Sequence, residues 1–165
     1  MKTRVSTIIL LSLVVFGYSY CQDKSEKKDQ KSSNYEVNKS ENEWKSILSP
    51  EEFNVLREKG TEYAYTGEYW DFKEEGVYTC AGCGNEIFTS DTKYDSHCGW
   101  PSFYNPKDSK AVEFKEDNSL GMKRIEVVCA KCGGHLGHVF NDGPKPTGLR
   151  YCINSVSMDF EKKEQ

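Results

Sequence analysis

Two cysteines, Cys98 and Cys152, lie outside the paired cysteine motifs of this chain and are candidates for thiol chemistry. Cys152 lies in the strand-like sequence RYCIN, and the alternation of side chains along a strand puts Arg150, Cys152 and Asn154 on one face. A guanidinium beside a thiol favours the thiolate, which is the nucleophilic form. The apolar residues change parity after Ser155, which predicts a bulge or bend near Asn154, as is common beside active sites. The alternative is that Cys152 is a small buried core residue.

Cys98 lies in the sequence SHCGWPSF, in which a glycine and a proline bracket Trp100. These flanking residues predict a loop, and loops commonly carry reactive residues. Cys98 is therefore a candidate reactive thiol, and the alternative is a half-exposed structural thiol.

Two of the three histidines, His135 and His138, lie in the glycine-rich sequence GGHLGHVF. On a regular strand, positions three apart face opposite ways, so the two imidazoles converge only if Gly137 breaks the pleat. Acid catalysis or hydrogen bonding is the functional interpretation, and the alternative is a pair of histidines whose hydrogen bonds are satisfied in the core.

Four further cysteines form two Cys-x-x-Cys pairs, Cys80 with Cys83 and Cys129 with Cys132. Each pair follows a strand-like segment and is followed by glycine. Such a turn points two thiolates at one metal, so two turns complete a tetrahedral zinc site with four sulfur ligands. Two disulfides, or a thioredoxin-like redox pair, are the alternatives. Because four protein ligands leave no position for water or substrate, the zinc would be structural and would join two distant segments.

The elements that must position these residues are mostly strands. The sequence SPEE at residues 49–52 predicts a helix start, with Gly60 at its end, and Trp44, Ile47 and Leu48 share one helical face before it. Short aromatic and β-branched runs then alternate with turn residues, and the predicted strands are Val77–Thr79, Glu86–Phe88, Arg124–Val128, His138–Phe140 and Arg150–Phe160. The pattern predicts a mainly β, mostly antiparallel domain with one or two N-terminal helices.

The N-terminus has the pattern of a bacterial signal peptide over residues 1–21, with Lys2 and Arg4 followed by a short apolar run. The run is too short for a comfortable permanent bilayer span, and a buried or anchoring helix is the alternative. Cys21 occupies the position of a lipidated cysteine, although Tyr20 is bulky where lipoproteins have a small residue. Lipidation, retention and removal of Cys21 therefore all stay open.

Residues 22–42 are almost entirely polar and predict a flexible linker, which leaves residues 43–162 for one domain. The 165-residue chain has a net charge of −4, and loss of residues 1–21, with two basic and no acidic residues, brings it nearer −6. An acidic chain lacks the lysines and arginines that displace phosphate counterions, which argues against nucleic-acid binding and against a zinc-ribbon binding module. A general thiol–disulfide oxidoreductase is the other competing class, but it usually keeps its redox cysteines close in sequence.

Several motifs, in order along the chain, resemble those of methionine-R-sulfoxide reductases of the B type, from Glu43 to Phe160. The matching motifs are TGEYW at 66–70, the two Cys-x-x-Cys pairs, CGWPSF at 98–103, HLGHVF at 135–140, NDGP at 141–144, and PTG at 146–148 leading into RYCINS at 150–155. His97 departs from the family, in which glycine is usual at this position. The N-terminal extension lies outside the match.

The resemblance implies a β-tent-like fold of two antiparallel sheets with N-terminal helices, and a structural zinc distant from the reaction centre. It implies that Cys152 is the nucleophile and Cys98 the resolving thiol. It also implies roles for six further residues: His135, His138 and Asn154 would surround the sulfoxide oxygen, Arg150 and Asp142 would support the site, and Trp100 would pack against the substrate methyl group.

The implied activity is reduction of the R epimer of methionine sulfoxide in oxidised proteins or peptides. A Cys152 thiolate attacks the sulfur while His135 or His138 supplies a proton, methionine leaves, and a sulfenic acid remains. Cys98 then forms a disulfide, which a thioredoxin-like dithiol donor reduces by exchange. We expect an exported monomer that repairs oxidised proteins, periplasmic or held at a membrane by a lipid on Cys21, with one structural Zn²⁺ ion and no nucleic-acid partner.

Overall fold

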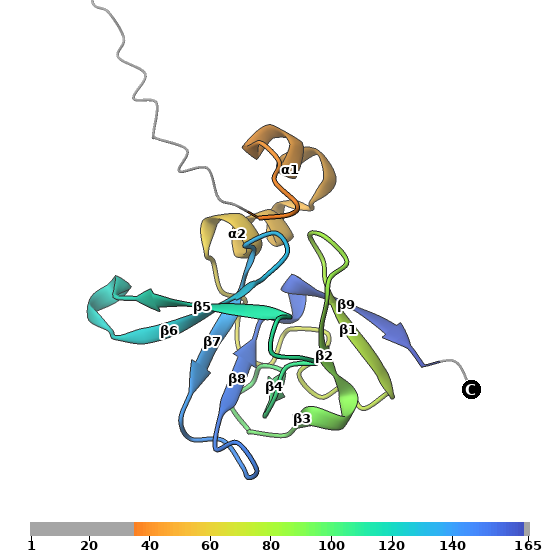
Figure 1. Cartoon of the computed structure of the whole chain (residues 1–165), viewed down its shortest axis with the longest axis vertical. Coiled ribbons are helices and arrows are strands. Elements are labelled where there is room, and N and C mark those ends of the chain that lie inside the picture. The colour runs from red at the N-terminus through yellow and green to blue at the C-terminus, as the bar shows by residue number, and fades with distance from the viewer. Residues whose placement is uncertain (1–34, 164–165) are drawn as a thin grey trace, which may run out of the picture. The chain divides into compact units, whose positions relative to one another are not determined.

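The computed structural model describes residues 35–163, so the predicted signal peptide and most of the predicted linker lie outside the described residues. Two helices and two antiparallel sheets make up this part of the chain (Figure 1). The helices are α1 (Glu41–Ile47) and α2 (Pro50–Glu58). The smaller sheet has the order β2 (Glu86–Thr89), β1 (Gly76–Cys80), β9 (Met158–Lys162). The larger sheet has the order β3 (Lys93–Tyr94), β4 (Ser102–Phe103), β8 (Arg150–Ile153), β7 (His135–Phe140), β6 (Arg124–Cys129), β5 (Val112–Asp117). The predicted fold class is confirmed.

Both helices begin with a capping box. Ser40 caps α1 and accepts from the backbone of Glu43, and Ser49 caps α2 in the same way, with Pro50 in its first turn. The α1 helix therefore starts inside the segment predicted as linker. The sequence predicted that Ile47 shares a buried helical face with Trp44 and Leu48. This prediction is wrong for Ile47, which is 54 % exposed. The helix ends at this residue and the backbone then becomes extended, so Ile47 does not continue the buried stripe.

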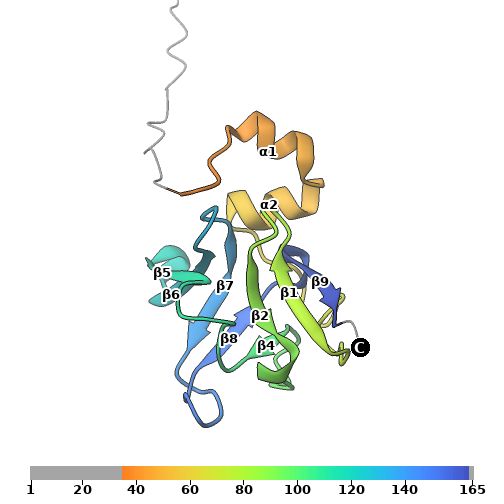
Figure 2. The same ribbon diagram turned by 45° about the vertical axis from the view of Figure 1, so that its right-hand side comes forward.

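The two sheets diverge from the helical end of the molecule, where β1 ends and β2 and β7 begin near α2 (Figure 2). The core lies between the sheets, beneath the helices, and is rich in aromatic side chains. Phe88 of the smaller sheet stacks on Phe103 of the larger one, with ring centroids 4.4 Å apart. Each fully buried side chain of this size contributes about 1.5–3 kcal/mol of hydrophobic stabilisation, so these contacts hold the sheets together.

The segment Arg150–Phe160, predicted as one strand, is two strands in different sheets. A short 3₁₀ turn, Ser155–Ser157, separates β8 from β9, and the chain crosses there from the larger sheet to the smaller. The predicted bend near Asn154 is therefore confirmed, and it leaves Cys152 close to the end of β8. None of the helices within residues 35–163 has the length and apolar character needed to cross a membrane.

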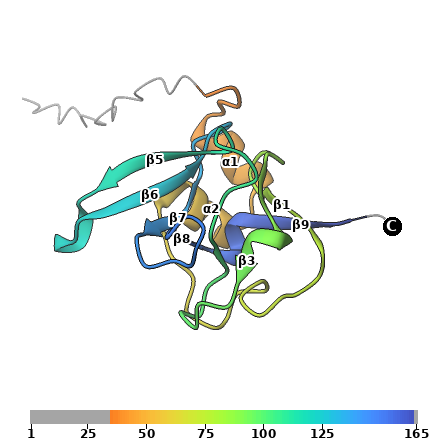
Figure 3. The same cartoon turned by 60° about the horizontal axis from the view of Figure 1, so that its bottom comes forward.

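The β5–β6 hairpin projects from the rest of the larger sheet (Figure 3). Its strands pair from Val112 opposite Cys129 to Asp117 opposite Arg124. The strand β5 was not predicted, because its side chains after Val112 are mostly exposed and charged. At its far end it nevertheless contributes Asp117 to the site described below.

Candidate active site and cysteine cluster

The structure brings Cys98 and Cys152 together, with 3.6 Å between their sulfur atoms. Cys152 lies on β8, and Cys98 lies in the loop that leads into β4. Tyr65 holds this loop on both sides of the thiol: its backbone N–H donates to the carbonyl of Gly99 (2.7 Å), and its hydroxyl donates to the carbonyl of His97 (2.9 Å). The two unpaired thiols are therefore adjacent without being joined.

The two thiols titrate in opposite directions. A hydrogen bond from Cys152 lowers the pKa of Cys98 to about 4, against the effect of burial and with help from Ser102 and Ser96. The same hydrogen bond, together with burial, raises the pKa of Cys152, and the positive charge of Arg150 acts in the opposite sense. At neutral pH the pair therefore holds one proton and one negative charge between two sulfurs.

A cavity of about 190 Å³ opens beside Cys152. Its lining residues are Thr61, Trp100, Arg124, Gly137, His138, Phe140, Cys152, Ile153 and Asn154. The indole N–H of Trp100 donates to the carbonyl of Glu62 (3.2 Å), which fixes the ring at the cavity wall. The cavity thus offers a thiol, an imidazole and an aromatic surface to one small ligand.

The rings of His135 and His138 lie near each other, with centroids 5.4 Å apart. The β6–β7 pairing contains a bulge: Gly137 pairs with Val127 and His135 with Val128, so two steps on β7 match one on β6. The pleat that convergence required to be broken is therefore interrupted, with Leu136 as the extra residue, next to Gly137 and not at it. A side chain there would not fit, because a Cβ atom would lie 2.1 Å from the carbonyl oxygen of Cys152.

His138 lines the cavity and is held from behind by a carboxylate. Its Nε2 lies 2.8 Å from Oδ2 of Asp117, which also accepts from Arg124 (2.6 Å). Hydrogen bonds from Ser119 and His138 hold the pKa of Asp117 well below its usual range. Burial lowers the pKa of His138, although Asp117 opposes this shift, so the imidazole is mostly neutral near pH 7.

His135 lies deeper, with its side chain 3 % exposed. Its Nδ1 is 2.8 Å from Oε1 of Glu126, whose other oxygen accepts from Lys59 (2.7 Å). Burial alone would raise the pKa of Glu126, but the hydrogen bonds from His135 and Lys59 outweigh it and lower this pKa to about 2. His135 therefore stands behind His138, as part of a buried ion-pair network.

Asn154 lines the cavity but has its amide engaged inside the protein. Its oxygen accepts from the backbone N–H of Glu62 (3.1 Å), and its Nδ2 donates to the carbonyl of Leu136 (2.9 Å). The buried carboxylate of Glu62 accepts in turn from the backbone N–H groups of Ser155 and Val156 (2.8 and 3.0 Å). These bonds hold the bend that follows Cys152 in place.

Arg150 and Asp142 form a two-pronged ion pair, with both N···O distances at 2.8 Å. Asp142 is largely exposed, whereas the Arg150 side chain is only 16 % exposed and stacks on Phe140, 4.5 Å from its ring centroid. Asp142 therefore acts on the site through Arg150, whose charge it holds next to the two thiols.

Five residues of this site were not among the sequence candidates: Lys59, Glu62, Asp117, Arg124 and Glu126. Only Glu126 could have been recognised from its sequence context. Glu126 lies among apolar residues in RIEVV, and an acid at a buried strand position requires a partner. Asp117 had no such signal, because its strand was not recognised.

The four remaining described cysteines form a second cluster, in which all four sulfur atoms lie within 4.8 Å of one another. The Cys80 and Cys132 sulfurs are 3.8 Å apart, and those of Cys83 and Cys129 are 3.6 Å apart. Four sulfurs at about 2.3 Å from one zinc lie about 3.8 Å from each other, so the cluster has the spacing of a tetrahedral metal site. The cysteines come from two turns, one between β1 and β2 and one between β6 and β7, both beside α2 (Figures 1 and 2).

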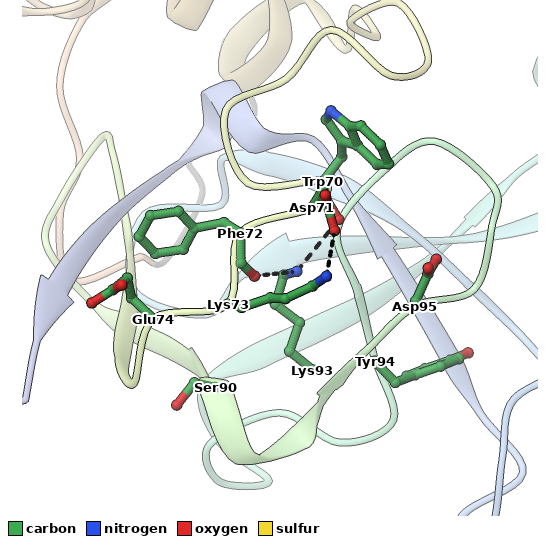
Figure 4. Close-up of a pocket in the computed structure, with 9 residues that line it drawn as sticks. All are labelled: Trp70, Asp71, Phe72, Lys73, Glu74, Ser90, Lys93, Tyr94 and Asp95. Carbon is green, nitrogen blue, oxygen red and sulfur yellow. Dashed lines mark hydrogen bonds and ion pairs between the residues drawn. The ribbon is translucent and has the colours of Figure 1, made fainter.

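Another cavity, of about 240 Å³, lies between residues 70–74 and residues 90–95 (Figure 4). Both of its lysines are engaged: Lys93 donates to the carbonyl of Phe72 (2.8 Å), and Lys73 pairs with Asp71 (3.1 Å). Neither a thiol nor an imidazole lines it. It therefore lacks the groups needed for thiol chemistry, and the cavity beside Cys152 is the stronger candidate site.

Comparisons with known proteins identify the family of this chain. The SelR domain model matches residues 48–162, so the chain belongs to the SelR domain family. The peptide methionine sulfoxide reductase MsrB of Leptospira interrogans is 58 % identical over 130 residues, which cover 79 % of this chain and 99 % of that protein. The proteins of the same name from Methanosarcina mazei and Acinetobacter baylyi are 61 % and 56 % identical over 128 and 129 residues, covering 78 % of this chain and 91 % and 93 % of theirs.

Proposed function

We propose that this protein reduces the R epimer of methionine sulfoxide in peptides and proteins to methionine. The observation that carries the proposal is the juxtaposition of the Cys152 sulfur, the His138 ring that shares its cavity, and the Cys98 sulfur 3.6 Å away. These are the parts that a sulfoxide reduction with a disulfide intermediate needs. The name shared by relatives that are 56–61 % identical supports it.

In the first step Cys152 gives up the proton that it shares with the Cys98 sulfur, 3.6 Å away, and attacks the electrophilic sulfur of the sulfoxide as a thiolate. The sulfoxide oxygen is a poor leaving group until it is protonated, and His138 is the imidazole that lines the cavity. Its Nε2 faces Asp117, so the proton would come from Nδ1 of the cationic ring. In net terms the oxygen and one proton move to the Cys152 sulfur, the substrate sulfur gains two electrons, and methionine leaves a sulfenic acid behind.

In the second step the Cys98 thiolate attacks the Cys152 sulfur. A sulfur–sulfur bond forms, the sulfur–oxygen bond breaks, and the oxygen leaves with a proton as water. The short distance between the two sulfurs means that little chain movement is needed for this bond to form. A dithiol donor of the thioredoxin type then reduces the disulfide by exchange and restores both thiols.

Preference for one epimer would follow from the shape of the cavity. If the methyl group packs on the Trp100 ring and the oxygen faces His138, only one arrangement about the chiral sulfur presents its remaining face to Cys152. Release of methionine from the separate R and S epimers, with dithiothreitol as reductant, tests the proposal. Turnover of the R epimer alone is expected. A general thiol–disulfide oxidoreductase or a zinc-binding module would release methionine from neither.

For the second cluster, we propose that Cys80, Cys83, Cys129 and Cys132 hold one structural zinc ion. The donor set is the one that zinc prefers, and the sulfur spacing fits a tetrahedron. When bound, the ion would supply cross-linking and no reactive position, because the protein fills all four sites. It would join the β1–β2 turn to the β6–β7 turn, far apart in sequence.

For the N-terminus, we propose that the protein is exported and works as a monomer, periplasmic or tethered by a lipid on Cys21. The signal-like pattern of residues 1–21 supports export. The intact mass of protein from fractionated cells distinguishes lipidation, retention and removal of Cys21, and light scattering gives the oligomeric state. An unprocessed chain in the cytosol would refute export and leave the catalytic assignment intact.

A further inference from the structure

Two serine hydroxyls surround the sulfur of Cys98. The Ser96 hydroxyl donates to it at 3.0 Å, and the Ser102 hydroxyl lies 3.5 Å from it. The two hydroxyl oxygens are 2.7 Å apart, so they are hydrogen-bonded to each other as well. Ser96 precedes Cys98 in the loop, whereas Ser102 is buried on β4, directly opposite Cys152. Two different elements thus converge on one sulfur.

The hydrogen-bond inventory of this cluster favours an anionic sulfur. A thiolate has only acceptor capacity, and each serine hydroxyl brings one proton to donate. Ser96 can donate to the sulfur while Ser102 donates to Ser96, or Ser102 can turn its proton to the sulfur itself. The Ser102 hydroxyl also lies 3.3 Å from the carbonyl of Trp100, which is a second acceptor for its proton. A thiol at Cys98 could donate to that carbonyl (3.6 Å), to the Ser102 hydroxyl or to the Cys152 sulfur, but only a thiolate can accept from Ser96, Ser102 and Cys152 together.

The loop that carries Cys98 is held firmly enough for such an arrangement to persist. Tyr65 bonds the carbonyl groups on both sides of the cysteine, and a Cβ atom on Gly99 would lie 2.8 Å from Ala64. The segment therefore packs closely against residues 64–65. Positioned donors stabilise a thiolate better than mobile water does, because their orientation is fixed before the charge forms.

Other charged or titratable groups also act on Cys98. Cys152 is hydrogen-bonded to it, and the positive charge of Arg150 attracts the negative charge of Cys98. The Tyr94 hydroxyl is neutral, because burial raises its pKa and nearby negative charge, including that of Cys98, adds to this shift. Two groups on the same loop, His97 and Asp95, are largely exposed and pair with each other at 3.2 Å. The pKa of Cys98, lowered to about 4 by Cys152 first and then by Ser102 and Ser96, is consistent with a stabilised thiolate.

We propose that Ser96 and Ser102 are positioning residues that keep Cys98 in its thiolate form for attack on the oxidised Cys152. The proposal rests on the proposed function for the identity of that step, in which the new disulfide bond forms and the sulfenic oxygen leaves as water. The serines take no part in the bonds that form or break. They act through Cys98, by raising the fraction of it that is ionised and by aiming its sulfur.

The first experiment measures the ionisation of Cys98 in a variant that cannot carry out the proposed reaction. In a Cys152→Ala background, alkylation of Cys98 by iodoacetamide is followed by peptide mass spectrometry as a function of pH. Ser96→Ala and Ser102→Ala should each raise the midpoint by about one pH unit or more, since each removes a hydrogen bond to a charged group. Ser96→Thr, which keeps the hydroxyl, should restore it. Ser90→Ala, which removes a hydroxyl bonded only to the backbone of Gly76 among the described residues, is the matched control.

The second experiment follows a single turnover without reductant in the otherwise unmodified chain. Ser96→Ala and Ser102→Ala should release one methionine per chain no more slowly than the parent chain, yet form the disulfide about tenfold more slowly at pH 7. Unchanged midpoints, or shifted midpoints with an unchanged rate of disulfide formation, would overturn the proposal. If no epimer yields methionine, the proposed function fails, while the alkylation titration still decides whether the serines stabilise the thiolate.

Discussion

His138 and Cys152 lie directly opposite each other on the adjacent antiparallel strands β7 and β8. Ser102 faces Cys152 from the other side, on β4. The proposed nucleophile Cys152 is thus flanked by His138, which can donate or accept a proton, and by Ser102, which lies next to the proposed resolving thiol. This three-strand register places both steps of the proposed reaction around one sulfur atom, with no element needing to move.

The roles of the two thiols can be separated by substitution. Cys152→Ser should abolish methionine release, because a hydroxyl is a far weaker nucleophile than a thiolate at neutral pH. Cys98→Ser should still release about one methionine per chain without reductant, since the sulfenic acid forms before Cys98 acts. Its turnover with a thioredoxin should be poor, as no disulfide forms. Normal turnover of Cys98→Ser with that donor would show that another thiol resolves the intermediate.

Asp117 should affect the rate of methionine release by changing the pKa of His138. It opposes the burial that lowers the pKa of His138, so its removal should lower that pKa further and reduce the cationic fraction at a given pH. We expect Asp117→Asn to slow methionine release in a single turnover by about 10–100-fold, within the range of general acid catalysis. Release in the variant should recover toward lower pH. Glu116→Gln, one residue away and exposed, is the control, and an equal loss in both variants would argue against the assignment.

Strong local patterns made much of the fold predictable. Three local motifs, each only a few residues long, are enough to predict the structure they adopt. They are the capping box of α2, the paired cysteine turns and the β-branched run of β6. Three strands were missed. Two of them, β3 and β4, have only two residues each, and β5 buries only Val112 fully, so no period-two pattern marks it.

The site was predictable in its thiols and histidines but not in the acids that orient them. Cysteine and histidine are rare, so their positions stand out, whereas Asp117 is one of 26 acidic residues. Its contact with His138 depends on the register of β5 against β6, which no local sequence signal sets. The histidine spacing indicated that the pleat must break near Gly137, but only the pairing with β6 shows that it does, with Leu136 as the extra residue.

The cysteine cluster should hold metal and stabilise the domain. The purified protein is expected to contain about one zinc ion per chain, measured by atomic absorption. Replacing any one of Cys80, Cys83, Cys129 or Cys132 by Ser should lower the melting temperature, and activity with it, because two turns beside α2 lose their cross-link. Cys21→Ser is the control, since it leaves the cluster intact. A zinc-free protein that is fully stable and active would support disulfides or spare thiols at these positions.

Glu126 should make stability depend on pH in the acid range. Its pKa is about 2 in the folded protein against an ordinary value of 4.5, because His135 and Lys59 donate to it. The unfolded chain therefore takes up this proton first, and the stabilisation present above about pH 4.5 is lost as the pH falls toward 2. Glu126→Gln should reduce the free energy of unfolding at pH 7 by about 2 kcal/mol, since it leaves a buried imidazole poorly paired. Urea unfolding followed by tryptophan fluorescence at pH 7, 4.5 and 3 measures this free energy. The difference in the free energy of unfolding between the variant and the parent should become smaller as the pH is lowered. A difference that stays constant across these pH values, or one that Glu116→Gln reproduces, would show that Glu126 is not the group responsible.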